Sequence, residues 1–322
     1  MRKLNWGILG LGQIATEFAE AFDVENAVLY AAGSRNDEKA AAFAKNYALE
    51  KSYGSYDALL EDPSIDVVYI ATPHSHHAEL ILKSLEHGKH VLSEKAITMN
   101  NDQLTQAMKL AKEKKLVLAE AMVIYHMPLY RKLKEIAQSG SLGKLKMIQV
   151  SFGSLKEKDP ANRFFNKDLA GGALLDIGIY ALSFARFFLT SQPKEIHTTM
   201  NFYETGVDEQ SGILLKNDQN ELATISLTFR AKMPKTGIVA FENGFITVND
   251  FPRADKATVT MPDGSVETVE AGDTKQAMNY EIADITDMIL SDGPNPSLAL
   301  THDVMEIMDT LRKDWGLHYD FE

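Results

Sequence analysis

The stretch WGILGLGQIATEF, Trp6 to Phe18, decides the fold of the first part of the chain. An apolar run that predicts a strand leads into Gly10-x-Gly12-x-x-Ala15 and then into a helical run. Glycines at such a turn permit a tight bend and let the backbone approach a ligand, so that a pyrophosphate can sit at the helix N-terminus. We therefore predict a dinucleotide-binding loop. Its cofactor-binding residues are Gly10, Gly12, Gln13 and Ile14.

After this turn, β-rich runs alternate with helical runs of 10–15 residues up to about Met122. Such alternation predicts βαβ crossovers and a parallel sheet covered on both faces. Beyond Met122 come several alternating strands, with Asn243-Gly244 and Asp263-Gly264 at hairpin turns, and then two closing helices. We predict an α/β chain: a doubly wound Rossmann sheet over residues 1–123, then an α+β domain with a mostly antiparallel open sheet over 124–322.

Composition limits the class of partner. The 322 residues carry a net charge of −12 and contain no cysteine. The negative charge argues against nucleic acid and anionic membranes, and the lack of cysteine fits a reducing cytoplasm. No apolar run approaches the roughly 20 residues that span a bilayer, and MRKLNWGILGLG is expected to be a first strand rather than a signal peptide. We expect a cytoplasmic protein with small-molecule partners.

The end of the second predicted strand bears on cofactor choice. NAD-preferring sites usually place an acidic residue there to bind the ribose 2′-hydroxyl. Here the chain reads Gly33-Ser34-Arg35-Asn36, and the first acid is Asp37. Ser34 and Arg35 could grip a 2′-phosphate, although Arg35 could also be a solvated arginine. We predict NADP as the cofactor, with NAD possible.

Polar residues follow the next strands in ATPHSHHAE and HVLSEKA. Ligands of open α/β sheets bind outside the carboxyl ends of the strands, so we expect these residues at the cofactor. They are Thr72, Pro73, His74, His77, Glu94 and Lys95. His74, His76 and His77 could suggest a metal, but they lack the i, i+4 helical spacing of zincins, and we expect no metal site.

A nearly apolar stretch, GGALLDIGIYALSFARFFL from Gly171 to Leu189, carries Asp176 and Tyr180. Helical i, i+4 spacing predicts one polar stripe made of Asp176, Tyr180 and Ser183. Burying an ionised carboxylate without partners is costly. The stripe is therefore either satisfied within the fold or lines a cavity where something binds.

Taken together, GILGLGQIA, ATPHSHHAE, GKHVLSEKA and GGALLDIGIYALSF resemble the glucose–fructose oxidoreductase/inositol dehydrogenase/MocA (Gfo/Idh/MocA) family. The resemblance implies that Lys95 lies by the nicotinamide and the reacting hydroxyl; Ala96 stands where the family usually has proline. Tyr180 takes the place of a histidine in the family's Asp-x-x-x-His signature. This pattern resembles the branch of dimeric dihydrodiol dehydrogenase and NADP-dependent D-xylose dehydrogenase.

The resemblance implies an NADP(H)-dependent oxidoreductase that moves hydride between the nicotinamide and a hydroxyl or carbonyl carbon of a sugar, polyol or vicinal diol. Lys95 and Tyr180 would handle the proton, and Asp176 would bind a substrate hydroxyl or hold Lys95. Weaker substrate-binding candidates are Arg163, Tyr125 and His126. The second-domain sheet is expected to form a homodimer or homotetramer.

Two other functions stay open. A non-catalytic dinucleotide sensor has the same fold, but it has no need of Lys95, Asp176 and Tyr180 together. A reductase of an unsaturated or imine-like substrate also uses this fold, and the lysine and Asp-x-x-x-Tyr pattern fits carbonyl chemistry better.

Overall fold

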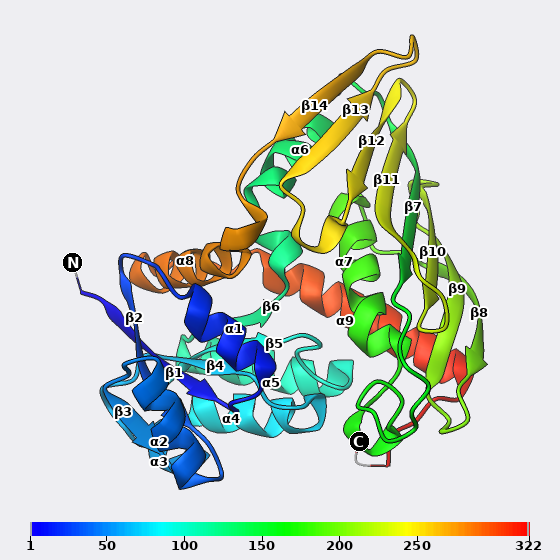
Figure 1. Cartoon of the computed structure of the whole chain (residues 1–322). Helices are drawn as coiled ribbons and strands as arrows, with labels where there is room; N and C mark the ends of the chain where they lie inside the picture. The colour runs from blue at the N-terminus through cyan, green and yellow to red at the C-terminus, as the bar shows by residue number, and fades with distance from the viewer. Residues whose placement is uncertain (1, 321) are drawn as a thin grey trace. The chain divides into compact units, whose positions relative to one another are not determined.

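The computed structural model describes residues 2–320 and 322, and the chain divides into two compact units (Figure 1). The first unit comprises Met1–Ala121 and Lys275–Leu298. The second unit comprises Met122–Thr274 and Ala299–Glu322. The predicted boundary at residue 123 lies close to the first division, but the prediction placed Lys275–Leu298 in the second domain.

The first unit is built on a six-stranded sheet in the order β3-β2-β1-β4-β5-β6, with every neighbouring pair parallel. This is the predicted doubly wound sheet. Its strands are β1 (Leu4–Leu9), β2 (Ala27–Gly33), β3 (Lys51–Tyr53), β4 (Val67–Ile70), β5 (His90–Glu94) and β6 (Leu118–Ala121). The helices between them are α1 (Gln13–Ala21), α2 (Asp37–Asn46), α3 (Tyr56–Leu60), α4 (His77–Glu86) and α5 (Asn101–Lys114).

Local chemistry explains where these helices start. Asn36, Ser55 and Asn100 are the N-cap residues of α2, α3 and α5, and each side chain accepts a backbone N–H of the first turn. Such caps satisfy donors that the helix leaves unpaired. Strands β1 to β3 are added toward one edge of the sheet and β4 to β6 toward the other. The turns after β1 and β4 therefore lie at the topological switch point, where such sheets bind ligands.

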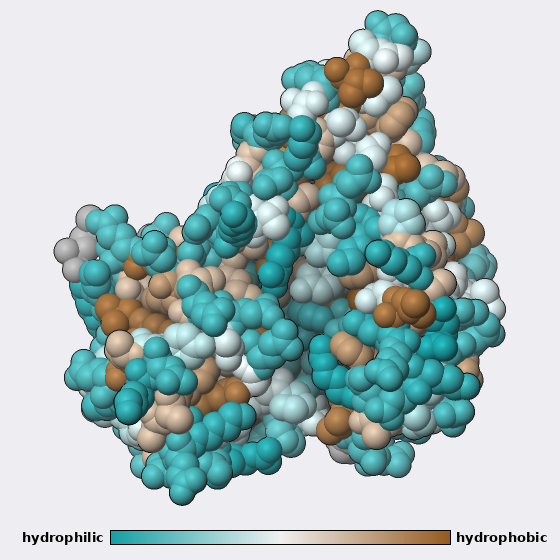
Figure 2. Space-filling model, viewed as in Figure 1, coloured by the Kyte–Doolittle hydropathy of each residue, from teal (hydrophilic) through white to brown (hydrophobic). Residues whose placement is uncertain are grey.

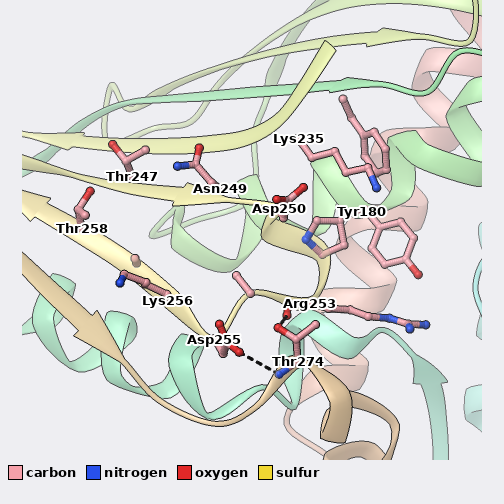
Figure 3. Close-up of a pocket in the computed structure, with 14 residues that line it drawn as sticks. Tyr180, Lys235, Thr247, Asn249, Asp250, Arg253, Asp255, Lys256, Thr258 and Thr274 are labelled. Atoms are coloured by element: carbon pink, nitrogen blue, oxygen red, sulfur yellow. Dashed lines mark hydrogen bonds between the residues drawn. The ribbon is translucent and has the colours of Figure 1, made fainter. Parts of the chain in front are cut away.

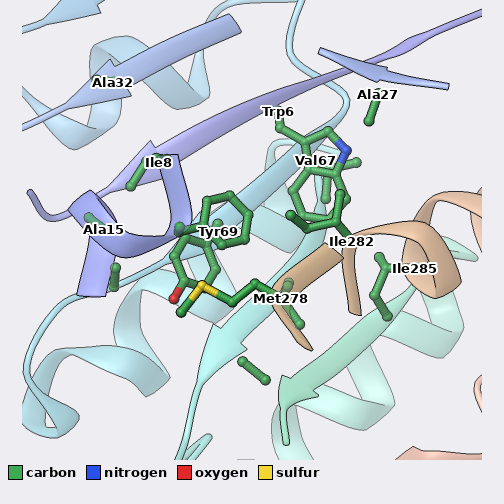
Figure 4. Close-up of a cluster of buried hydrophobic side chains, with 14 of the residues drawn as sticks. Trp6, Ile8, Ala15, Ala27, Ala32, Val67, Tyr69, Met278, Ile282 and Ile285 are labelled. Carbon is green, nitrogen blue, oxygen red and sulfur yellow. The ribbon is translucent and has the colours of Figure 1, made fainter. Parts of the chain in front are cut away.

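Helix α8 (Ala277–Leu290) belongs to the first unit because its apolar face completes that unit's core. Met278 and Ile282 join the buried cluster that contains Trp6 and Tyr69 (Figure 4). An amphipathic sequence shows that a helix must bury one face, but it does not say against which sheet. Tertiary packing therefore places this helix in the first unit, although the sequence predicts it in the second domain.

The second unit contains an eight-stranded sheet in the order β14-β13-β12-β11-β7-β10-β9-β8. It is mostly antiparallel, as predicted, and β10 with β7 is its parallel pair. Its strands are β7 (Leu145–Gly153), β8 (Glu195–Phe202), β9 (Asp208–Lys216), β10 (Leu222–Thr228), β11 (Met233–Phe241), β12 (Gly244–Asn249), β13 (Lys256–Thr260) and β14 (Val266–Glu270). Its helices are α6 (Pro128–Gln138), α7 (Ile179–Phe188) and α9 (Ser297–Trp315), the last from Ala299 on.

The two predicted glycine turns join β11 to β12 and β13 to β14, and both glycines have positive φ. Helix α7 lies against β7, β10 and β11. Its close approach depends on Gly237, because a Cβ there would stand 2.3 Å from Cζ of Phe184. The stretch Lys167–Phe188 is long and apolar enough to cross a membrane, but 78% of its most apolar window is buried inside the protein. The face seen in Figure 2 is largely hydrophilic, with separate apolar patches.

The start of this apolar segment differs from the expected continuous helix. Leu174–Gly178 forms a π-helix that continues into α7. A π turn inserts an extra residue, so side chains four apart no longer stack as they do on an α-helix. Asp176 and Tyr180 are partly exposed, whereas Ser183 is fully buried, and its hydroxyl has no hydrogen-bond partner among the residues described. Ser183 therefore does not share the environment of the other two.

Candidate active site

The glycine turn between β1 and α1 has the geometry that its sequence predicts. Gly10 has φ +88°, and a Cβ there would lie 2.7 Å from Thr72 Cγ2 and 3.0 Å from the Ala71 carbonyl oxygen. At Gly12, by contrast, a Cβ would meet nothing within 4 Å. Gly12 and Gln13 are exposed, so the N–H groups at the start of α1 are accessible. An open helix N-terminus behind a glycine turn fits a dinucleotide pyrophosphate.

A cavity of about 410 Å³ lies at the end of β2 and contains Arg35, Tyr56 and Lys83 in its wall. Lys83 is paired with Glu79 (3.1 Å) and with Asp57 (3.4 Å). Arg35 has no carboxylate partner within the described part of the chain. Burial raises the pKa of the Tyr56 phenol, and the Arg35 guanidinium opposes that shift. An arginine without an acidic partner beside a tyrosine can bind a phosphate and stack on an adenine.

His77 ties together the turns that follow β4 and β5. The ring is fully buried, with Nε2 2.8 Å from the Thr72 carbonyl oxygen and Nδ1 2.8 Å from that of Ala96. Burial lowers its pKa and so favours the neutral ring, which donates from one nitrogen only. His74 Nε2 lies 3.0 Å from the Lys95 carbonyl oxygen. Both rings therefore hold the backbone around Lys95.

Other predicted residues of this edge lie in the same region. Tyr69 donates a hydrogen bond to Glu94 Oε1, and Glu120 Oε1 accepts the N–H of Ile97 at 3.0 Å. The Lys95–Ala96 peptide bond is cis, although Ala96 stands in the family's proline position. The first unit thus brings Thr72, His77 and Lys95 to adjacent turns.

Two rings of the histidine cluster, those of His74 and His77, are directed at separate backbone carbonyl groups. Over residues 2–320 and 322, the group with metal-compatible spacing is His302, Asp303 and Glu306 on α9. Asp303 Oδ2 already accepts two Arg186 nitrogens, at 2.7 and 2.8 Å. The Asp303 carboxylate is therefore already engaged in an ion pair with Arg186.

In the second unit, Tyr180 lines a cavity of about 760 Å³ at the ends of β11, β12 and β13 (Figure 3). Its ring lies 6.4 Å from that of Phe152. The wall also carries Lys235, Arg253 and Asp255, which the sequence did not single out. They lie in PRADK and MPK, segments without a recognisable motif, and only folding brings them to Tyr180.

The weaker substrate candidates lie elsewhere in the second unit. Arg163 is exposed, and its guanidinium stacks on Phe164 with 4.3 Å between Cζ and the ring centroid. The Tyr125 ring stacks on Phe187 at 6.4 Å. His126 is buried directly after the short helix Val123–Tyr125. The wall of the Tyr180 cavity includes none of these three candidates among the described residues.

Comparison with known proteins places both units in one group. Residues 4–122 match the family model described as "Oxidoreductase family, NAD-binding Rossmann fold", and residues 130–247 match "GFO/IDH/MocA C-terminal domain". The chain is 31% identical over 330 residues to trans-1,2-dihydrobenzene-1,2-diol dehydrogenase of Xenopus tropicalis, covering 98% of this chain and 99% of the relative. It is 35% identical over 257 residues to D-xylose 1-dehydrogenase (NADP(+)) of Hypocrea jecorina, covering 71% and 66%.

Solved structures share the fold. A levoglucosan dehydrogenase in complex with NADH and L-sorbose superposes with a TM-score of 0.89 at 22% identity, covering 98% of this chain and 97% of the other. A 3-ketoreductase from Actinomadura kijaniata in complex with NADP and TDP-benzene superposes with a TM-score of 0.86 at 24% identity, covering 97% and 98%. At such identities these structures establish the fold alone.

Proposed function

Since the chain belongs to the Gfo/Idh/MocA family of oxidoreductases, we propose that it is an NADP(H)-dependent dehydrogenase or reductase. It would transfer hydride between the nicotinamide and a hydroxyl or carbonyl carbon of a sugar, polyol or vicinal diol. The observation that carries this proposal is the Tyr180 cavity, because it places a phenol beside charged and hydroxyl side chains in a hollow large enough for a small substrate. The diol and xylose dehydrogenases among the relatives support the substrate class.

The cofactor would be held by the first unit. The N–H groups that follow Gly10 and Gly12 would bind its pyrophosphate, with Gln13 and Ile14 in the first turn of α1. Arg35, supported by Ser34, would bind a 2′-phosphate, because its guanidinium lines a cavity and has no carboxylate partner in the described chain. The part of the cofactor site that receives the nicotinamide would be formed by residues at the ends of β4 and β5. These residues are Thr72, Pro73, His74, His77 and Glu94. NAD would bind more weakly.

The nicotinamide supplies the hydride acceptor, and the chain's own side chains must move the proton. We assign the proton transfer to the Tyr180 hydroxyl. An ammonium near a phenol favours the phenolate, so Lys95 would assist the transfer and also donate to the substrate oxygen. Asp176 would hold a substrate hydroxyl or orient Lys95. Arg163, Tyr125 and His126 remain weaker candidates for substrate contacts.

The second-unit sheet would form the subunit interface. On β10, Ile225 and Leu227 are buried on the α7 side, whereas Thr224 and Ser226 face the other way. That other face also exposes Leu214, which pairs with Thr224. A sheet with helices on one face leaves the opposite face to be covered, and a second copy of the chain would cover it. A cytoplasmic location without nucleic-acid or membrane partners stays a prediction.

Reduced-nicotinamide absorbance tests the function. Purified protein is mixed with NADP or NAD and a panel of sugars, polyols and vicinal diols, and the carbonyl counterparts are tested with the reduced cofactors. We expect turnover of at least one compound, faster with NADP(H). Tight NADP binding without turnover of any compound in either direction would favour the sensor instead.

A further inference from the structure

The Tyr180 cavity carries more positive charge than the chain as a whole would suggest. The chain has a net charge of −12, yet three basic and two acidic side chains line this cavity. Its volume of about 760 Å³ falls within the roughly 300–1,000 Å³ of pockets that hold drug-sized ligands. The cavity therefore has room for a substituent beyond the reacting carbon. The charged residues are Lys235, Arg253, Lys256, Asp250 and Asp255.

Two of these charged side chains are engaged within the protein, and two others, Asp250 and Lys235, are exposed. Lys256 Nζ lies 2.8 Å from Glu270 Oε1. Asp255 Oδ2 accepts the backbone N–H of Thr274 at 3.0 Å, and this hydrogen bond lowers the pKa of Asp255. Asp250 is exposed at the turn after β12. Arg253 and Lys235 remain, and within the residues described neither has a carboxylate in ion-pair range.

Arg253 is held in place by its backbone. It ends the short helix η5 (Phe251–Arg253), whose first residue is fully buried. The Tyr130 hydroxyl donates to the Phe251 carbonyl oxygen, and Thr274 Oγ1 donates to that of Arg253 at 2.8 Å. Arg253 is partly buried as a residue, and its guanidinium has no hydrogen-bond acceptor among the described residues. A donor that extends from a fixed backbone and has no protein acceptor is available to bind a ligand.

Lys235 lies on the Tyr180 side of the same cavity. Its ammonium stands 5.2 Å from the centroid of the Phe152 ring, which in turn neighbours Tyr180. Figure 3 shows the Arg253 side chain extending toward the Tyr180 end of the pocket, with Lys235 on the other side of the phenol. Two cations therefore flank the proposed proton-transfer group.

We propose that Arg253 and Lys235 bind an anionic oxygen group of the substrate, a phosphate ester or a carboxylate. The substrate class is then an anionic sugar or polyol derivative rather than a neutral one. A guanidinium forms paired N–H···O bonds with either group, and a neighbouring ammonium adds a point charge. This inference rests on the proposed function, because it takes the Tyr180 cavity to be the substrate site.

Matched substrates test the inference. D-glucose, D-glucuronate and D-glucose 6-phosphate share one ring and differ in the charged group, so their kcat/KM values compare neutral, carboxylate and phosphate forms. We expect one anionic form to exceed D-glucose by at least about 10-fold. Arg253→Met should shrink that ratio by roughly 10- to 100-fold, mainly through KM. The control Lys232→Met removes an exposed lysine that lies outside the cavity wall and should keep the ratio. Equal kcat/KM values for all three sugars, or an unchanged ratio in Arg253→Met, would overturn the inference.

Binding of inorganic phosphate separates this inference from the proposed function. Calorimetric titration is done in an Arg35→Gln background, because Arg35 is itself a proposed phosphate ligand. We expect Arg253→Met to weaken phosphate binding at least about 10-fold in that background. If it does so while no sugar is turned over, the anion site stands and the proposed reaction fails. If neutral sugars are turned over and Arg253→Met leaves the phosphate affinity unchanged, the proposed reaction stands and the anion site fails.

Discussion

Asp208 and the backbone N–H of Leu174 are joined by a hydrogen bond of 2.7 Å to Oδ2. Leu174 begins the π-helix that contains Asp176, so a carboxylate at the start of β9 caps the segment that leads to Tyr180. Asp208 is fully buried, and its Oδ1 has no hydrogen-bond partner among the residues described. Burial raises the pKa of Asp208 to about 6.

This relationship predicts how Asp208→Asn changes stability with pH. The folded-state pKa of about 6 lies above the ordinary 3.8, so the native state binds the proton more tightly than the unfolded state. The stabilisation of the fold by this tighter proton binding is fully present below pH 3.8 and is lost as the pH rises through about 6. The amide still accepts the Leu174 N–H and carries no charge. We expect the variant to be more stable at neutral pH by up to about 3 kcal/mol.

Urea unfolding across this pH range measures the difference between the variant and the unmodified chain. The control Asp218→Asn changes an exposed acid and should shift stability by less than about 0.5 kcal/mol. A less stable Asp208→Asn at neutral pH would show that the fold requires the ionised carboxylate.

His77→Phe keeps a ring of similar size but removes both nitrogens that face the Thr72 and Ala96 carbonyl groups. A buried group left without its partner costs about 1–3 kcal/mol, so we expect a loss of roughly that size in chemical unfolding. His87→Phe, at the exposed end of α4, should cost much less. Unchanged stability combined with weaker NADP binding would instead mean that the ring contacts the cofactor.

Arg35→Ala tests the cofactor preference. An arginine–phosphate contact contributes about 1.5–3 kcal/mol, so the NADP dissociation constant should rise roughly 10- to 100-fold while that of NAD changes little. Fluorescence titration with both reduced cofactors measures this, with Lys39→Ala on the exposed side of α2 as control. Equal weakening of both cofactors would leave Arg35 with a stacking role only.

Tyr180→Phe removes one oxygen and preserves the ring that neighbours Phe152. If Tyr180 transfers the proton, turnover should fall by about 10²–10⁴-fold while NADP affinity holds. Lys95→Met should cost at least as much, and the two losses together should be less than additive, because the residues act as one unit. Near-normal turnover of Tyr180→Phe with a lower Tm would make the phenol a structural group. Tyr47→Phe serves as the control for loss of an exposed hydroxyl.

The proposed interface predicts the mass in solution. Light scattering should give at least twice the 35.8 kDa of one chain. Leu214→Asp places a charge on the open sheet face and should lower the mass toward a single chain, because an unpaired charge in an interface is costly. The control Val28→Asp alters a similarly exposed apolar residue of β2 in the first unit and should leave the mass in solution unchanged. A single-chain mass for the unmodified protein at micromolar concentration would contradict the interface.

Much of the fold and part of the candidate site are predictable from the sequence. Alternation of strand and helix runs up to Met122 predicts the parallel sheet, and hairpin glycines such as Gly244 predict antiparallel pairing; both are confirmed. The order of the four motifs predicts the family, which the matches over residues 4–122 and 130–247 confirm. The roles of Lys95, Asp176 and Tyr180 stay predictions.

The sequence by itself determined what depends on neighbours in the chain. Turn chemistry at Gly10, helix caps such as Asn36, and apolar periodicity act within a few residues, so they can be read locally. Tertiary structure alone decided that α8 completes the first unit's core, because an apolar helix face does not specify its partner. It also decided that Arg253 and Lys235 share a cavity with Tyr180, since residues this far apart in the chain meet only when β11, β12 and α7 pack together.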